Sequence, residues 1–281
     1  MIIQTKEITN KVAQNLIEMN ASLSDDMNYM INYANQLEKS ETAKNVFKAI
    51  QENMRIANKK NRPICQDTGM VVAFVTMGQD VQIQGGGIEE AIQNGVHKGY
   101  LEGYLRKSVV DDPIIRNNTE DNTPAVIHYR VVKGDYLKID LMAKGFGSEN
   151  TSALKMLKPS DGIEGVKRFI LDTIEKGAPN ACAPIVIGIG IGGTFEKSAL
   201  MAKEALLKPL YWHNEKKHFM KLEQELLQEA NNMGIGPMGM GGSNTVLGVN
   251  ILDYPTHIAG LPVAVNICCY VNRHRKVIFS D

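Results

Sequence analysis

The first sixty residues carry apolar side chains at helical spacing, and they predict three helices, at 8–19, 26–37 and 41–57. After them the spacing changes. An uninterrupted apolar run at 70–77 is typical of a buried strand. The pattern therefore predicts a helical N-terminal part, which is followed by a region that mixes helices and strands.

After residue 78, segments with helical spacing alternate with short apolar runs, as in mixed α/β proteins. No internal repeat, low-complexity tract or hydrophilic linker interrupts the chain, so we expect one unit over 1–281. The expected fold class is α/β mixed, with a helical N-terminal cap at 1–60 and, at 61–281, a two-lobed arrangement of small sheets flanked by helices. Further helices are expected at 88–106, 161–176, 194–207 and 216–232, and further strands at 125–132, 136–142, 185–191, 246–252 and 263–272.

One pair of expected strands has a short connection. The strands at 125–132 and 136–142 are separated by Lys133-Gly134-Asp135. Glycine and aspartate are favoured in tight turns between antiparallel strands. The segment is therefore predicted to be a β-hairpin.

The composition narrows the classes of partner and compartment. The 31 basic and 31 acidic side chains cancel, so neither nucleic acid nor a membrane surface is an expected partner. The N-terminal residues lack the basic stretch and apolar core of a signal peptide, and no apolar run approaches the roughly 20 residues that cross a bilayer. We therefore expect a cytoplasmic protein.

The four cysteines occur at three separate places in the sequence, Cys65, Cys182 and the adjacent pair Cys268-Cys269. None forms the C-x-x-C pairs of structural zinc sites, and so few cysteines in so long a chain do not predict a disulfide framework. Three thiolates would fit an iron–sulfur cluster with one iron left open to a substrate oxygen. Each cysteine taken alone could equally be an inert buried side chain.

Two glycine-rich segments have alternative interpretations. Gly188, Gly190 and Gly193 match G-x-G-x-x-G between an expected strand and helix, but no strand ending in an acidic residue follows, so nucleotide binding is weakly supported. These glycines could instead allow close approach of an anion or a cluster sulfide, or simply form a tight turn. The loop at 234–242 indicates either backbone packed closely on another segment or a flexible surface loop.

Polar side chains directly follow the first cysteine. Gln66, Asp67 and Thr68 precede an apolar strand that does not need them, which indicates a pocket at the mouth of the strand. Asp67 could handle a proton, and Gln66 could bind a carboxylate or hydroxyl group. Either residue could also cap a turn.

Four segments together resemble the iron–sulfur hydro-lyases, which include class I fumarate hydratase and the alpha subunit of L(+)-tartrate dehydratase. CQDTG at 65–69 and AKGFGSEN at 143–150 are the most specific, and they are joined by Cys182-Ala183-Pro184 with its glycine turn and by residues 257–275. The resemblance implies a [4Fe-4S] cluster with three cysteine ligands and one open iron. Those ligands would be Cys65, Cys182 and one of the last pair; the family's pattern of an apolar strand, a cysteine and then a basic cluster fits Cys269 better than Cys268.

The resemblance also implies the residues that meet the substrate. Gln66, Arg106 and Gly147 would bind it, and Asp67 and His257 would be catalytic. An arginine suits a carboxylate because it binds it bidentately, and a histidine can donate to another carboxylate. Without the resemblance, Arg106 would be a solvated helix end and His257 a loop histidine.

Single-chain members of that family carry a second, C-terminal domain with the catalytic threonine and further basic residues. We therefore expect this chain to be an alpha subunit in a hetero-oligomer with a separate beta subunit. The expected reaction is reversible hydration of fumarate to (S)-malate, with L(+)-tartrate dehydration as the close alternative. A non-catalytic module with a structural metal and a nicotinamide-dependent dehydrogenase are more distant alternatives.

Overall fold

The computed structural model describes residues 1–280 and divides them into two compact units, each with its own sheet. The mixed α/β fold class is confirmed. The first unit comprises Met1–Ser24, Asn53–Phe146 and the residues from Arg273 on. The second comprises Asp25–Glu52 and Gly147–Asn272, so the first sixty residues are divided between the units.

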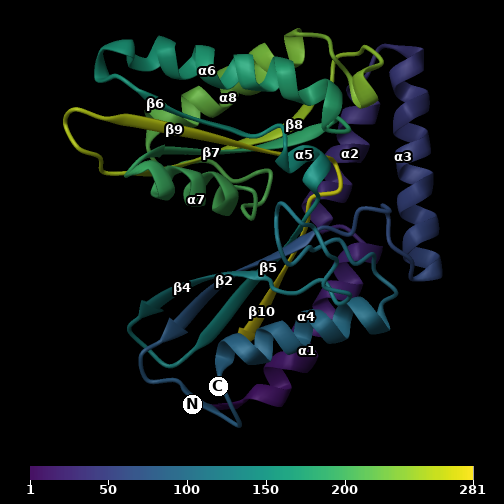
Figure 1. Cartoon of the computed structure of the whole chain (residues 1–281). Helices are drawn as coiled ribbons and strands as arrows, with labels where there is room; N and C mark the ends of the chain where they lie inside the picture. The colour runs from purple at the N-terminus through teal and green to yellow at the C-terminus, as the bar shows by residue number, and fades with distance from the viewer. Residues whose placement is uncertain (281) are drawn as a thin grey trace. The chain divides into compact units, whose positions relative to one another are not determined.

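The first unit is built on a four-stranded sheet with two helices, α1 and α4, against one face (Figure 1). The strand β2 is parallel to β4 and antiparallel to β5, which in turn is antiparallel to β10. A small parallel pair, β1 and β3, completes the unit. In sheet order the strands are β10 (Arg273–Phe279), β5 (Leu137–Lys144), β2 (Met70–Gly78) and β4 (Val126–Val132); the others are β1 (Ile2–Gln4), β3 (Gln82–Gln84), α1 (Thr5–Ala21) and α4 (Ile88–Glu102).

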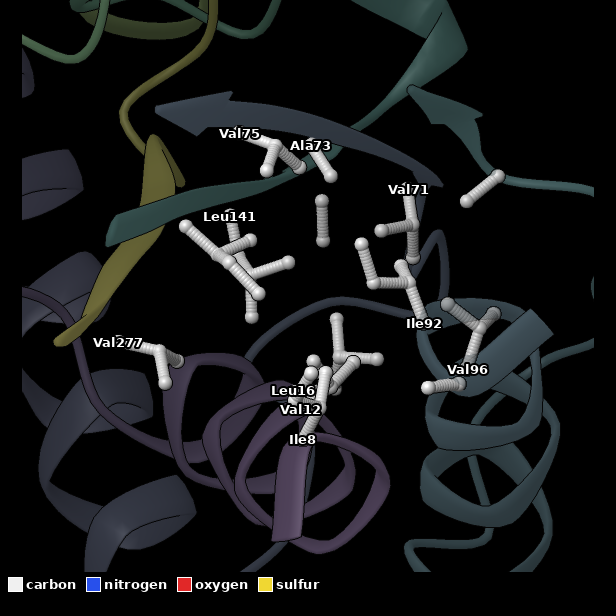
Figure 2. Close-up of a cluster of buried hydrophobic side chains, with 14 of the residues drawn as sticks. Ile8, Val12, Leu16, Val71, Ala73, Val75, Ile92, Val96, Leu141 and Val277 are labelled. Carbon is white, nitrogen blue, oxygen red and sulfur yellow. The ribbon is translucent and has the colours of Figure 1, made fainter. Parts of the chain in front are cut away.

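Apolar side chains from the sheet and both helices meet in one core (Figure 2). Val71, Ala73 and Val75 alternate along β2, so all three project from the same face of the sheet. Residues spaced by four on α1, among them Val12 and Leu16, face them and are fully buried. This core fixes the strand ends at which the candidate site lies.

The predicted hairpin between β4 and β5 is wrong. The two strands do not pair, because β2 lies between them and pairs with both. Their connection instead crosses the end of β2, where Tyr136 O accepts a hydrogen bond from Gly78 N at 2.8 Å. Gly78 makes this possible: a Cβ there would lie 2.2 Å from Gly134 O.

The second unit has a four-stranded sheet covered on both faces (Figure 1). Helices α6 and α8 contact one face, and α7 packs on the other. The central strand β7 is parallel to β8 and antiparallel to β9. In sheet order the strands are β6 (Ala153–Leu157), β9 (Leu261–Cys268), β7 (Ile185–Gly192) and β8 (Val246–Tyr254); the helices are α2 (Asp25–Leu37), α6 (Gly162–Gly177), α7 (Phe195–Ala205) and α8 (Lys217–Asn232), with short turns η1 (Pro159–Asp161), η2 (Ala178–Asn180) and η3 (Pro237–Gly239).

Two helices include a boundary between the units. The long helix α3 (Glu41–Lys60) begins in the second unit and ends in the first. The one-turn helix α5 (Phe146–Glu149) begins at the last residue of the first unit's central segment. The AKGFGSEN motif therefore supplies residues to both units.

The predicted helices agree with the structure except at one end that concerns the site. The helix expected at 88–106 ends at Glu102, because Gly103 caps it and Tyr104 has a φ of 52°. Arg106 therefore lies in a loop. The segment expected as a strand at 263–272 is β9 followed by a turn, and β1, β3, β6 and β10 were not predicted.

Among residues 1–280, no helix is both long enough and apolar enough to span a bilayer.

Candidate active site

In the first unit, the CQDTG segment and the AKG segment lie at the same edge of the sheet. Met70, the first residue of β2, pairs with Lys144, the last residue of β5, and Ala143 pairs with Arg273, the first residue of β10. Cys65 lies in the loop that enters β2, as predicted. Three strand ends therefore surround the predicted substrate-binding segment.

Asp67 joins the two motifs through its carboxylate. Oδ1 accepts a hydrogen bond from Gly69 N, and Oδ2 accepts one from Phe146 N, both at 2.9 Å. A Cβ at Gly145 would lie 3.1 Å from Oδ2, so a glycine is needed for this approach. Asp67 thus fixes the backbone on either side of it, and each of its oxygens retains a lone pair for a further donor.

Arg273 supports the same segment from the interior, a role that was not predicted from the sequence. Its side chain is 2% exposed. Nη1 donates to Asp67 O at 2.7 Å and to Asn20 Oδ1 at 2.9 Å, and Nε donates to Ala143 O at 3.2 Å. A buried guanidinium needs such acceptors, because its charge cannot be shed by deprotonation. The only sequence signal was a basic residue shortly after Cys269.

A second buried group supports the CQDTG segment from α4. The Tyr100 hydroxyl lies 2.8 Å from both Thr68 O and Gly69 O. Burial raises the pKa of Tyr100, and the nearby Arg273 charge offsets this only in part. The hydroxyl therefore remains a donor at neutral pH.

The loop that carries Arg106 is tied to the same place. Thr68 Oγ1 donates to Arg106 O at 3.0 Å, and Asn122 Nδ2 donates to Gly69 O at 3.1 Å. The side chains of Gln66 and Arg106 are exposed, while Cys65 and Asp67 are half-buried. The backbone is thus held from the interior, and the predicted substrate groups reach solvent.

In the second unit, two cysteines and a glycine lie at one edge of the sheet. Cys182 precedes β7 and Cys269 follows β9; because these strands are antiparallel and Val186 pairs with Cys268, the two cysteines lie at the same strand ends. Gly147 precedes β6, which joins the same edge through a hydrogen bond from Ile267 N to Ser152 Oγ at 3.1 Å.

The cysteines differ in exposure. Cys182 is exposed and has a φ of 52°, whereas Cys269 is half-buried, just beyond the end of β9. Cys268, the last residue of that strand, is 2% exposed. Alternation along the strand therefore places the two neighbouring sulfurs in different surroundings.

His257 does not lie with these residues. It occupies the exposed loop between β8 and β9, and its Nδ1 accepts a hydrogen bond from Ala259 N at 3.2 Å. Cys269 follows the other end of β9, whose eight residues span about 26 Å. Within one chain, His257 and the cysteine edge are therefore at opposite ends of the sheet.

The glutamate of the AKGFGSEN motif is bound inside the second unit. Glu149 forms an ion pair with Lys203 of α7 and accepts a hydrogen bond from Asn266 Nδ2 at 3.1 Å. These contacts fix α5 between α7 and β9. The ion pair and the hydrogen bond thus give the Glu149 carboxylate partners within the unit.

The glycines of the G-x-G-x-x-G match serve helix packing. A Cβ at Gly188 would lie 2.1 Å from Ala202 O, and one at Gly190 would lie 2.1 Å from Ser198 O. Both oxygens belong to α7, which therefore packs directly on the backbone of β7. The next element after α7 is the helix α8, so the strand of a dinucleotide-binding unit does not follow.

The glycine-rich loop at 234–242 packs closely on the Cys182 segment. Met238 N donates to Ala183 O at 2.8 Å, and Gly239 lies against Pro179. Gly236 has a φ of 70°, and a Cβ there would lie 2.1 Å from Gly241 O. The expectation that this loop packs its backbone on another segment is therefore confirmed.

The donor chemistry fits an iron–sulfur cluster. All four cysteines are free thiols, and three of them retain exposed surface at strand ends. Thiolates are the ligands that such clusters take. Within residues 1–280, however, no three His, Cys, Asp or Glu side chains are gathered in a metal-binding arrangement, and Cys65 belongs to a different unit from Cys182 and Cys269.

A family comparison defines the class of protein to which these features belong. The family model described as Fumarate hydratase (Fumerase) matches residues 9–278. The chain therefore belongs to this family of hydro-lyases, and it is an enzyme of that class.

The relatives add a second, narrower description. A protein of Methanocaldococcus jannaschii, provisionally named L(+)-tartrate dehydratase subunit alpha, is 40% identical over 95% of each chain. The L(+)-tartrate dehydratase subunit alpha of Escherichia coli O157:H7 is 30% identical over 97% of this chain and 90% of its own. The protein of the same name from strain K12 is 29% identical over the same shares.

Proposed function

We propose that this chain is the alpha subunit of a [4Fe-4S] hydro-lyase that hydrates fumarate reversibly to (S)-malate together with a separate beta subunit. The observation that carries the proposal is the grouping of the predicted residues at sheet edges. Cys182 and Cys269 share one edge in the second unit, and Cys65, Gln66 and Asp67 occupy one edge in the first. Membership of the fumarate hydratase family supports the reaction.

Cys65, Cys182 and Cys269 would hold the cluster. When bound, it would supply a Lewis acid, at an iron without a cysteine ligand, for the oxygens of the substrate. Cys268 is the poorer candidate because its side chain is buried within β9. The Cys182 thiol, by contrast, is exposed.

The polar residues of the first unit would bind and orient the dicarboxylate. The exposed Arg106 guanidinium would pair bidentately with one carboxylate, and the Gln66 amide would donate to another oxygen. Two backbone donors fix the Asp67 carboxylate in place. It would therefore accept a hydrogen bond from the substrate hydroxyl in a defined orientation. Gly147, whose missing Cβ would meet nothing within 4 Å, leaves space for close approach of substrate to the backbone.

His257 would take part only through another chain, because it lies at the opposite end of β9 from Cys269. The base that removes the carbon-bound proton would belong to the beta subunit. Relatives named as alpha subunits support the existence of that partner. The chain alone is therefore expected to be inactive.

L(+)-tartrate dehydration to oxaloacetate is the second candidate function. The names of the relatives favour it, because three of them are called L(+)-tartrate dehydratase subunit alpha. Both reactions move water across the same pair of carbons in a four-carbon dicarboxylate. The distinguishing contacts would lie partly on the beta subunit.

The test is an anaerobic assay of the chain reconstituted with iron and sulfide and combined with a beta subunit of this hydro-lyase family. Fumarate, L-tartrate and a methylated fumarate are supplied separately, and consumption of each is followed. Turnover of fumarate by the pair but not by either chain supports the main proposal. Turnover of L-tartrate alone establishes the second function, and full fumarate turnover by the alpha chain alone contradicts the need for a partner.

A further inference from the structure

A buried carboxylate lies outside the residues assigned to the site, at the corner between α2 and α3. Glu38 is 3% exposed. Within its own corner, Oε1 accepts hydrogen bonds from Lys39 N at 2.8 Å and from Ser40 N at 3.1 Å. Hydrogen bonds from neutral backbone and side-chain donors compensate its charge.

The same carboxylate binds the two residues that directly follow the glycine-rich loop and are distant from Glu38 in sequence. Ser243 N donates to Oε2 at 3.0 Å and Ser243 Oγ donates to Oε1 at 3.1 Å, while Asn244 Nδ2 donates to Oε2 at 2.9 Å. A Cβ at Gly242 would lie 3.0 Å from Oε2. The close fit of this glycine lets the loop approach the carboxylate directly.

The other side of the loop reaches a proposed cluster ligand. Met238 N donates to Ala183 O, the carbonyl of the residue after Cys182, at 2.8 Å. Within the loop, Gly241 N donates to Ile235 O at 2.8 Å, and Gly236 N donates to Thr245 Oγ1 at 3.0 Å. Few backbone groups are left to move independently, so displacement at Ser243 would pass to Ala183.

We propose that Glu38 is a positioning residue for Cys182, acting through Ser243 and Asn244 and the glycine-rich loop at 234–242 that precedes them. This inference rests on the proposed function in one respect, namely that Cys182 is a cluster ligand. Every partner of the Glu38 carboxylate is an N–H or O–H donor. Glu38→Gln would therefore turn an NH₂ group toward donors and release the loop while leaving the size of the side chain unchanged.

The same unit offers a matched control. Glu223 is 2% exposed, and its carboxylate accepts hydrogen bonds from Ile251 N at 2.8 Å and Asn214 N at 3.2 Å; His213 Nδ1 also lies 3.2 Å from its Oε2. Ile251 lies on β8 toward the end away from the glycine-rich loop. Glu223→Gln thus makes the same chemical change, at similar burial, without touching the loop.

The experiment compares hydrogen exchange of the wild-type chain, Glu38→Gln and Glu223→Gln, without cluster, in peptides covering 234–245 and 178–184. In Glu38→Gln we expect both peptides to exchange about tenfold faster, the effect of losing one charge-assisted hydrogen bond. In Glu223→Gln they should exchange as in the wild type. Faster exchange at 234–245 with an unchanged 178–184 would overturn the proposal, as would equal effects of the two variants.

A second measurement connects the loop to the cluster. Each variant is reconstituted anaerobically, and the loss of visible absorbance is followed in the presence of an iron chelator. Faster loss in Glu38→Gln than in Glu223→Gln supports the proposal, and equal rates contradict it. If the wild-type chain takes up no cluster, the proposed function fails, whereas the exchange measurement still decides whether Glu38 positions the Cys182 segment.

Discussion

Asp67 Oδ2 accepts a hydrogen bond from Phe146 N at 2.9 Å, and this single bond ties the CQDTG motif to the AKGFGSEN motif. Seventy-nine residues separate the two partners. Both motifs were visible in the sequence, but the contact explains why they occur together: one supplies a carboxylate and the other supplies the backbone that it holds.

Asp67→Asn should lower both activity and stability. An amide can accept only one of the two backbone hydrogen bonds and turns a donor toward the other, so the free energy of unfolding should fall by about 1.5–3 kcal/mol. Denaturant unfolding and the fumarate assay measure the two effects. Asp112→Asn is the control, because its Oδ1 accepts Ile114 N and Ile115 N at 2.7 Å on an exposed loop. Comparable losses in that variant would argue against a special role for Asp67.

Arg273→Lys should destabilise the first unit although it keeps the positive charge. A lysine cannot reach Asp67 O, Asn20 Oδ1 and Ala143 O together, and buried acceptors would lose their donors at a cost of about 2–4 kcal/mol. Chemical unfolding checks this. Arg275→Lys, two residues along β10 and half-buried, should cost less than about 1 kcal/mol. An equal loss of unfolding free energy in both variants would show that the buried hydrogen bonds of Arg273 add no more stability than the contacts of Arg275.

Local patterns predicted the helices and the position of Cys65 in the loop before β2, because helical spacing and an apolar run depend only on neighbours in sequence. The placement of β2 between β4 and β5 was missed, since a short Gly-Asp connection has the same composition whether it closes a hairpin or crosses a third strand. The burial of Arg273 was missed for a related reason. Its acceptors come from α1, the CQDTG loop and β5, and no local pattern records them.

The third cysteine ligand can be decided by two serine variants with opposite expected effects. Cys269→Ser should abolish the cluster with little loss of stability, since the side chain is half-buried beyond the strand. Cys268→Ser should retain the cluster and lower the free energy of unfolding by about 1–3 kcal/mol, because it buries a hydroxyl in β9. Iron and sulfide analysis and thermal unfolding of both variants give the answer. The reverse pattern would move the ligand by one residue.

His257→Asn should leave stability within about 0.5 kcal/mol of the wild type, because the side chain is exposed in a loop. If His257 serves the site of another chain, the variant is inactive by itself. Mixing it with Cys269→Ser, which is inactive for a different reason, should then restore part of the activity. In some mixed oligomers a site would combine the intact cysteines of one chain with the intact His257 of the other. Absence of recovery in mixtures shown to exchange subunits would place the histidine outside the reaction.

Glu38 should make the stability of the chain sensitive to acid. Burial by itself raises the pKa of this carboxyl, but the hydrogen bonds from Asn244 and from the backbone of Ser40, Ser243 and Lys39 outweigh it and lower the pKa from 4.5 to about 2. Because the folded pKa lies below the unfolded one, this stability is fully present above about pH 5 and is lost as the pH falls toward 2. It amounts to at most about 3 kcal/mol.

The difference in unfolding free energy between the wild-type chain and Glu38→Gln is the measurement that isolates this effect. It should be largest near neutral pH and should shrink as the pH is lowered from about 5 to about 2, since the protonated glutamic acid and the glutamine are then both neutral. Glu223→Gln should show the opposite trend, because burial raises the pKa of Glu223, so that its buried charge is a cost that protonation relieves. A difference for Glu38→Gln that did not change with pH would mean that the carboxylate charge has no part in holding the glycine-rich loop.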